Sequence, residues 1–158
     1  MKRIVTLLSP LAIVGLAVVS LAQVNPRGQA SFDGDAVTVD YGRPSAKGRD
    51  VMSMIEPGST WRMGADNSTT LTSTKDLEFG GTKVSKGTYT LTAYFAEKEK
   101  WNLVLSKDGD KVAETPGRFE KDQPPVEQMT IALKQESGKA TLVLNWGTYR
   151  LSADFKIV

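Results

Sequence analysis

Two short segments of the sequence concentrate side chains that can hold a ligand. Residues 41–49 read YGRPSAKGR and residues 61–67 read WRMGADN, so three arginines, a lysine, a tryptophan and an Asp-Asn pair gather in loop-like stretches. Guanidinium groups bind carboxylates and phosphates through paired hydrogen bonds, and an indole ring stacks on apolar faces. We therefore predict a site for a small anionic or sugar-like ligand, with the candidate residues Tyr41, Arg43, Lys47, Arg49, Trp61, Arg62, Asp66 and Asn67.

The same arginines also have a structural interpretation. In long loops of β-proteins, arginine often donates to loop carbonyls or pairs with a nearby acid, which fixes the shape of the loop. Under this interpretation Arg43, Arg49 and Arg62 hold the loops and bind no ligand. Trp61 is the tryptophan that we expect at the surface, because it stands beside arginine and near glycine in the second segment.

The sequence contains neither histidine nor cysteine, which restricts its chemistry. Histidine is the usual general base at neutral pH, and both residues are common ligands of transition metals. Catalysis would have to use carboxylates, lysine, tyrosine or hydroxyls, and no catalytic residue is assigned. A carboxylate-based hydrolase is the alternative function, and it requires two of Asp40, Glu56 and Asp66 to face each other about 5–10 Å apart. We expect no metal site and no cofactor.

The N-terminus has the pattern of a signal peptide over residues 1–22. Lys2 and Arg3 form a positive end, residues 4–21 are almost entirely apolar, and cleavage is expected between Ala22 and Gln23. The protein is then periplasmic or secreted and keeps no stable membrane span; a retained membrane anchor is the alternative. Cleavage lowers the basic count from 20 to 18, against 18 acidic residues. No basic block remains to follow a phosphate backbone, so nucleic acid is not an expected partner.

Residues 23–158 alternate apolar and polar side chains with a period of two, which is typical of strands with one buried face. In the last run Leu151, Ala153 and Phe155 fall on one face, while Arg150 and Asp154 fall on the other. Turns that contain glycine separate the runs and indicate hairpins. We predict about eight or nine strands and a single antiparallel β-sandwich or jelly-roll-like domain, with a lipocalin-like closed barrel as the alternative.

The alternation also predicts which side chains form the core and where it is interrupted. We expect burial of Trp101, Leu103, Leu142, Leu144, Leu151 and Phe155. Residues 42–61 and 115–125 interrupt the pattern with glycine and proline, so we predict two irregular connections there. The first contains a short apolar run at residues 51–55, which can form one helical turn or a brief strand.

Several motifs together resemble one known family, an exported bacterial domain of unknown function. That family carries a Tyr-Gly-Arg-Pro-Ser-x-Lys-Gly-Arg segment followed by a Trp-Arg-x-Gly-Ala-Asn segment, which residues 41–49 and 61–67 match. Its Gly-Gly and Gly-Thr-Tyr hairpin is similar to residues 80–91. The chain departs from the pattern at residues 65–68, where Ala-Asp-Asn-Ser replaces the usual Ala-Asn-Glu-Ala. The resemblance implies the fold and export, and it implies no activity.

Three functions follow as hypotheses. The first is a non-enzymatic binding module for a small anionic or carbohydrate ligand, or for an envelope protein, at the arginine-rich loops. The second is the histidine-free hydrolase. The third is a purely structural envelope protein in which the arginines are paired internally.

Overall fold

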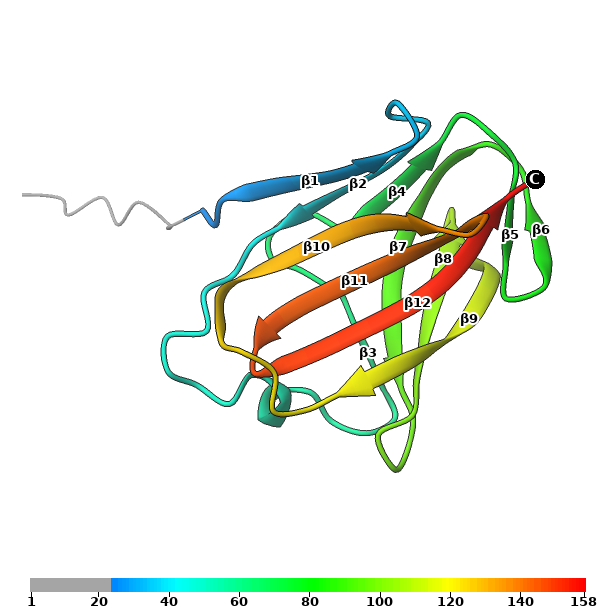
Figure 1. Cartoon of the computed structure of the whole chain (residues 1–158). Coiled ribbons are helices and arrows are strands. Elements are labelled where there is room, and N and C mark those ends of the chain that lie inside the picture. Colours follow the sequence, from blue (N-terminus) through cyan, green and yellow to red (C-terminus); the bar gives the residue numbers. More distant parts are fainter. Residues whose placement is uncertain (1–23) are drawn as a thin grey trace, which may run out of the picture.

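The protein is built almost entirely from antiparallel strands (Figure 1). The computed structural model describes residues 24–158, and among them the only helical element is the single 3-10 turn η1 (Val51–Met54). This confirms the prediction of an all-β fold. The strands are β1 (Arg27–Phe32), β2 (Val37–Gly42), β3 (Ser59–Trp61), β4 (Thr70–Ser73), β5 (Leu77–Phe79), β6 (Thr82–Val84), β7 (Gly87–Phe95), β8 (Trp101–Lys107), β9 (Asp110–Glu120), β10 (Val126–Glu136), β11 (Lys139–Gly147) and β12 (Tyr149–Ile157).

The strands form one curved sheet in the order β1-β2-β4-β7-β8-β9-β12-β11-β10. β10, β11 and β12 make one layer, and β2, β4, β7 and β8 make the other (Figure 1). The two end strands, β1 and β10, lie against each other, so the sheet almost closes on itself. The predicted antiparallel sandwich is therefore confirmed, and its sheet is nearly closed into a barrel, which was the alternative.

β9 carries the chain from one layer to the other. Its first half pairs with β8, and its last residues pair with β12, where Phe119 lies opposite Leu151. Pro116 and Gly117 stand at the crossing. Proline has no N–H to leave unpaired at the bend, and a Cβ at position 117 would lie 2.9 Å from Leu151 Cδ1. The prediction of an irregular connection was therefore wrong for residues 115–120, because this Pro-Gly pair bends a strand without ending it.

The core lies between the layers and follows the period-two pattern. All six side chains predicted to be buried are buried: Trp101, Leu103, Leu142, Leu144, Leu151 and Phe155. Short strands from the first half complete the core with Val37, Val39 and Leu71. The first irregular stretch, residues 42–61, contains the helical turn η1 and the short strand β3.

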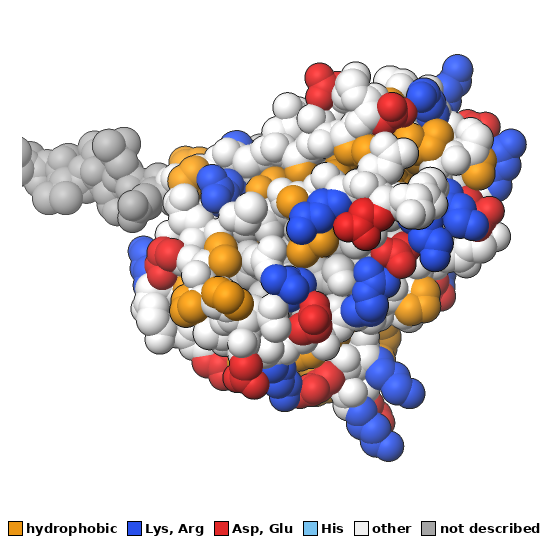
Figure 2. Space-filling model, viewed as in Figure 1, with side chains coloured by type: hydrophobic (Ala, Val, Ile, Leu, Met, Phe, Trp, Pro, Cys, Tyr) orange, Lys and Arg blue, Asp and Glu red, His pale blue; other side chains and the backbone are white. Residues whose placement is uncertain are grey.

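The outer face of β9, β12 and β11 carries charges of both signs, which Figure 2 shows interspersed over this side of the molecule. Arg118 binds the Asp154 carboxylate through two hydrogen bonds of 2.9 Å each, and Thr141 donates to the same carboxylate at 2.8 Å. Arg118 is the main reason why the pKa of Asp154 lies below its usual value. Charged side chains on the polar faces predicted for these strands therefore pair with one another at the surface.

The part of the chain that the structure describes has no helix long and apolar enough to cross a membrane. The predicted signal peptide, residues 1–22, lies outside the described residues.

Candidate functional site

The first segment predicted to bind a ligand, residues 41–49, runs along the open edge of β10 and closes the barrel there. Tyr41 is 3 % exposed, and its hydroxyl accepts a hydrogen bond from the Ile131 amide at 2.9 Å and donates to the Ile131 carbonyl at 3.3 Å. The Arg43 guanidinium donates to the Met129 carbonyl and to the Thr130 hydroxyl, both at 3.1 Å. Both side chains thus supply the edge of β10 with partners that no neighbouring strand provides.

The backbone of the same segment continues this closure. The Met129 amide donates to the Pro44 carbonyl at 3.0 Å, and the Ala46 amide donates to the Glu127 carbonyl at 2.8 Å. Between them Ser45 forms an isolated bridge with Gln128. We call this zone, residues 41–47 against residues 127–131, the seam. In the described part of the chain, β1 and β10 are not paired by a regular ladder of hydrogen bonds. Tyr41, Arg43 and Pro44 supply hydrogen bonds that join residues 41–47 to the edge of β10 instead.

Two glycines make room for the seam. Gly28 of β1 lies under the Tyr41 and Arg43 side chains, and a Cβ there would lie 2.7 Å from Tyr41 Cζ and from Arg43 Cδ. Gly42 touches the second segment, since a Cβ there would lie 2.0 Å from the carbonyl oxygen of Ala65. The two predicted segments therefore meet through their backbones, because only glycine permits so close an approach.

The side chains of the second segment turn in different directions. Arg62 donates to the backbone carbonyl of Asp66, and the Asp66 carboxylate accepts a hydrogen bond from the Asn25 amide at 2.9 Å. Asn67 accepts a bond from Arg27 at 3.4 Å through its carbonyl. Trp61, which we expected at the surface, is half-buried and packs inward, because β3 pairs with β7 and thereby joins the barrel wall.

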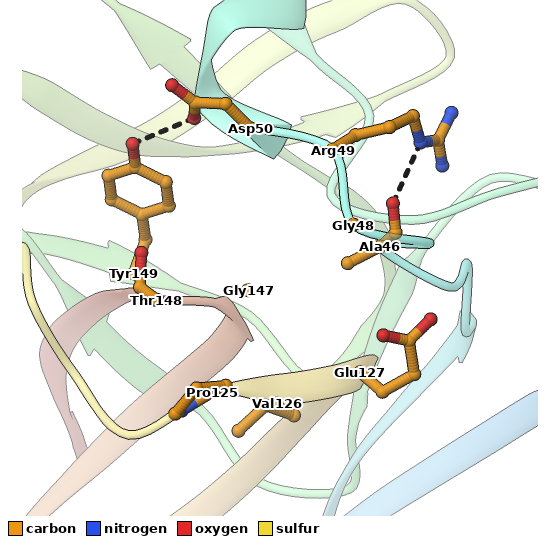
Figure 3. Close-up of a pocket in the computed structure, with 10 residues that line it drawn as sticks. All are labelled: Ala46, Gly48, Arg49, Asp50, Pro125, Val126, Glu127, Gly147, Thr148 and Tyr149. Carbon is orange, nitrogen blue, oxygen red and sulfur yellow. Dashed lines mark hydrogen bonds between the residues drawn. The ribbon is translucent and has the colours of Figure 1, made fainter.

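A hollow of about 480 Å³ opens next to the seam (Figure 3). Three stretches of chain line it: residues 46–50 before η1, residues 125–127 at the start of β10, and the turn 147–149 between β11 and β12. Of the eight predicted ligand-binding residues, only Arg49 lines it, and Lys47 lies next to it, with its backbone amide donating to the Glu127 carboxylate at 2.9 Å. The structure thus divides the predicted site among the seam, the loop 62–67 and the hollow.

The rim of the hollow combines one arginine with two carboxylates. Arg49 donates to the carbonyls of Ser45 at 2.7 Å and Ala46 at 2.9 Å, and Figure 3 shows its guanidinium directed away from the opening. Asp50 and Glu127 stand on opposite sides of the hollow, both exposed to solvent. The Tyr149 hydroxyl donates to Asp50 Oδ1 at 2.8 Å, which joins the turn 147–149 to the segment before η1.

The pKa of the Tyr149 hydroxyl is affected by the carboxylates around it. Its hydrogen bond to Asp50 raises its pKa above the usual value for tyrosine, and removal from solvent and the negative charges of Asp50, Asp122 and Glu99 raise that pKa further. A raised phenol pKa means that a second negative charge is disfavoured at this position.

Beneath the hollow lies a cluster of aromatic rings that contains all three tryptophans of the chain. Trp61 stacks on Trp146 with a centroid distance of 6.1 Å and meets the edge of Trp101 at 6.2 Å. Phe119 stacks on Tyr149 at 5.6 Å, so Tyr149 belongs both to this cluster and to the rim of the hollow. The indole Nε1 atoms of Trp101 and Trp146 are buried without a hydrogen-bond partner among residues 24–158.

A family model described as a protein of unknown function, DUF2911, matches residues 25–155. The chain belongs to the DUF2911 family. The match extends from the residues before β1 into β12, so it includes the seam, the hollow and the aromatic cluster. No curated protein and no solved structure matches the chain.

The acids considered for hydrolysis stand apart from the hollow in this DUF2911 protein. Asp40 pairs with Arg27 on β1, Asp66 accepts from the backbone of Asn25, and neither they nor Glu56 line the hollow. Within residues 24–158 no three acidic side chains are grouped closely enough to hold a metal ion.

Sequence reasoning missed most of the hollow of the DUF2911 domain. Gly147 was interpreted only as a turn, Tyr149 only as part of the last strand, and Pro125 only as the end of an irregular connection. One signal was present: Gly147 adopts a positive φ of 56°, and a Cβ there would lie 3.2 Å from Val51 Cγ2, which brings the turn against η1. Glycine at that position predicts a turn, but nothing in the sequence says what the turn faces.

Proposed function

We propose that this protein is a non-enzymatic binding module that holds a small, neutral, sugar-like ligand in the hollow beside η1. The observation that carries the proposal is the hollow of about 480 Å³, which lies within the range of about 300–1,000 Å³ usual for small-molecule sites. Its walls come from three separate stretches of chain that the barrel holds in place. Walls that are already in place favour binding, because the protein loses little conformational entropy when the ligand enters.

The charges around the hollow favour a neutral ligand over an anion. The guanidinium of Arg49 is engaged by two carbonyls of its own loop, whereas Asp50 and Glu127 present carboxylate oxygens. Ionised carboxylates only accept hydrogen bonds, and a sugar supplies several hydroxyl donors. The Tyr149 ring adds an apolar surface beside them. Of the two ligand classes expected from the sequence, the sugar-like one is therefore the better match.

A periplasmic or secreted location remains part of the proposal. It is supported by residues 1–22, whose positive end, apolar run and small-residue exit have the pattern of a signal peptide.

A purely structural role is the second candidate, and one observation favours it. Arg43, Arg49 and Arg62 all donate hydrogen bonds to backbone carbonyls of the chain itself. These contacts support the structural interpretation of the arginines that suggested a binding site from the sequence. If the protein is a structural envelope protein, we expect the hollow to bind no small ligand.

A binding experiment separates these two candidates. The purified protein is titrated with methyl glycosides of glucose, galactose and mannose and with N-acetylglucosamine, and binding is followed by saturation-transfer NMR and calorimetry. We expect at least one of these sugars to bind, and Glu127→Gln to weaken it about tenfold or more, since hydrogen bonds to charged groups contribute about 1.5–3 kcal/mol.

Glu114→Gln is the matched control. Glu114 is an exposed acid of β9 that pairs with Lys111 at 3.1 Å and does not line the hollow, so its replacement should leave sugar affinity unchanged. Absence of binding by every sugar at millimolar concentration would contradict the proposal and favour the structural role.

A further inference from the structure

A second hollow, of about 270 Å³, opens on the outer face of the layer that β9, β12, β11 and β10 form, the side of the molecule that Figure 2 shows. We call it the outer hollow. Three of its lining residues are basic, two are acidic and three are uncharged: Arg118, Lys134, Arg150, Glu120, Glu136, Thr141, Val143 and Ser152. None of these residues lines the hollow beside η1, so the two spaces are separate.

The strand register puts two small side chains at the centre of the outer hollow. Ser152 of β12 lies opposite Val143 of β11 on one side and opposite Arg118 of β9 on the other. Its neighbours along the strand, Leu151 and Ala153, are buried in the core, so the alternation of β12 turns Ser152 outward. Ser152 and Val143 therefore form the floor, and the longer side chains around them form the walls.

The Ser152 hydroxyl is an unused hydrogen-bonding group at this floor. Ser152 is only 5 % exposed although it lies on the outer face, because the longer side chains of the neighbouring strands surround it. Its hydroxyl forms no hydrogen bond with any other residue of the range 24–158. Polar groups that are buried this deeply usually have a partner. A ligand atom that accepts a hydrogen bond would supply one.

Two basic side chains of the walls also keep donors that are not used. The Arg150 Nε–H donates to the Asn145 side-chain oxygen at 3.2 Å, whereas Arg150 Nη1 lies 3.7 Å from Glu120 Oε2, beyond hydrogen-bond reach. The two terminal nitrogens of Arg150 thus make no hydrogen bond in the described part of the chain. The Lys134 ammonium, on β10, has no ion pair among the same residues.

From this geometry we infer that the outer hollow binds a small monocarboxylate. The carboxylate accepts hydrogen bonds from the Ser152 hydroxyl and from the terminal nitrogens of Arg150, and Lys134 adds positive charge from β10. The short apolar part of the acid lies on Val143. Because the lining has three basic and two acidic side chains, its one excess positive charge matches a single negative charge, and the two acids disfavour a doubly charged anion.

Arg118 belongs to the wall of this site and does not bind the ligand. Both of its terminal nitrogens donate to the Asp154 carboxylate, each at 2.9 Å, which holds the guanidinium beside Ser152. The site goes beyond the proposed function, since it shares no residue with the hollow that would hold a sugar. A small acid and a sugar could therefore bind the same molecule at once.

The test is a titration of the ¹⁵N-labelled protein with sodium propionate, with sodium chloride keeping the ionic strength constant. Propionamide is the matched ligand, because it has nearly the same shape and no charge. We expect saturable shifts of the Val143 and Ser152 amides and of the Arg150 Nε–H with propionate. Propionamide should bind about tenfold more weakly or worse, because hydrogen bonds between two charged groups are roughly twice as strong as those between neutral groups.

Ser152→Ala separates binding from stability. The hydroxyl has no partner in the described chain, so the variant should keep the urea midpoint of the wild type while its propionate affinity falls about threefold or more. Ser106→Ala is the matched control. Ser106 is half-buried on β8, in the other layer, and does not line the outer hollow, so this variant should keep the propionate affinity of the wild type.

Lys134→Gln removes one positive charge from the wall and should weaken propionate binding about threefold or more. Lys100→Gln is its control, because Lys100 is an exposed lysine of the hairpin between β7 and β8 and does not line the outer hollow. Affinity of Lys100→Gln for propionate should equal that of the wild type at the same ionic strength.

Three results would each overturn the inference. The first is that the propionate shifts rise linearly and match those that added sodium chloride causes, which would show a general effect of salt. The second is that propionamide binds as tightly as propionate, and the third is that Ser152→Ala or Lys134→Gln binds propionate as the wild type does. Methyl glycosides should leave the Val143 and Ser152 amides unshifted, so the outcome of the sugar titration does not decide this one.

Discussion

Tyr41→Phe removes one oxygen atom from the seam and keeps the ring that fills the core. In the wild type the hydroxyl pairs with both the amide and the carbonyl of Ile131, at 2.9 and 3.3 Å. Phenylalanine leaves both of these backbone groups without a partner beside a side chain that is 3 % exposed. An unpaired buried polar group costs about 1–3 kcal/mol, and the longer bond lies at the low end of that range. We expect the free energy of unfolding to fall by about 2–3 kcal/mol.

Urea unfolding measures this loss. With a slope of about 2 kcal/mol/M, the midpoint should move down by about 1 M, and the slope itself should not change. Tyr94→Phe is the matched control, because Tyr94 is 38 % exposed and has no side-chain hydrogen bond among the described residues, and it should cost less than about 0.5 kcal/mol. The account of the seam is refuted if the two variants lose the same small amount of stability.

Three further predictions follow from the fold. Arg43→Lys should lower the free energy of unfolding by about 1–2 kcal/mol in urea without changing sugar affinity, because lysine cannot hold both the Met129 carbonyl and the Thr130 hydroxyl. Leu144→Ala should cost about 2–5 kcal/mol by the same measurement, since the side chain is buried in the core. Asp154 has a pKa below its usual value in the folded state, so it stabilises the fold above the unfolded-state pKa, and this stabilisation is lost as the pH falls through the folded-state pKa. In Asp154→Asn the free energy of unfolding should therefore depend less on pH in that acidic range. A pH dependence equal to that of the wild type would contradict this.

Much of the fold could be predicted because alternation along one strand is a local property. β8, β11 and β12 each show period two, and the six core side chains predicted on them are buried. β9 was harder, since Pro116 and Gly117 favour a turn when considered alone. Only the pairing of β9 with two different strands shows that they bend a strand between layers.

The candidate site was predicted less well for a physical reason. Side-chain types show what a segment can bond to, and they do not show whether the partner is a ligand or another part of the chain. Arg43 and Tyr41 were predicted as candidate ligand-binding residues, yet their hydrogen-bond partners on β10 lie 86 and 90 residues further along the sequence. The hollow likewise joins residues 46–50 to residues 147–149, and that proximity depends on strand register, which no single segment determines.

A map of backbone amide shifts on titration with methyl glycosides is the most direct test of the claim that the seam holds the fold while the hollow holds the ligand. The account predicts that the perturbed amides belong to residues 46–50, 126–127 and 147–149, which surround the hollow. Shifts confined to residues 62–67, or no shifts at all with saturating sugar, would contradict it.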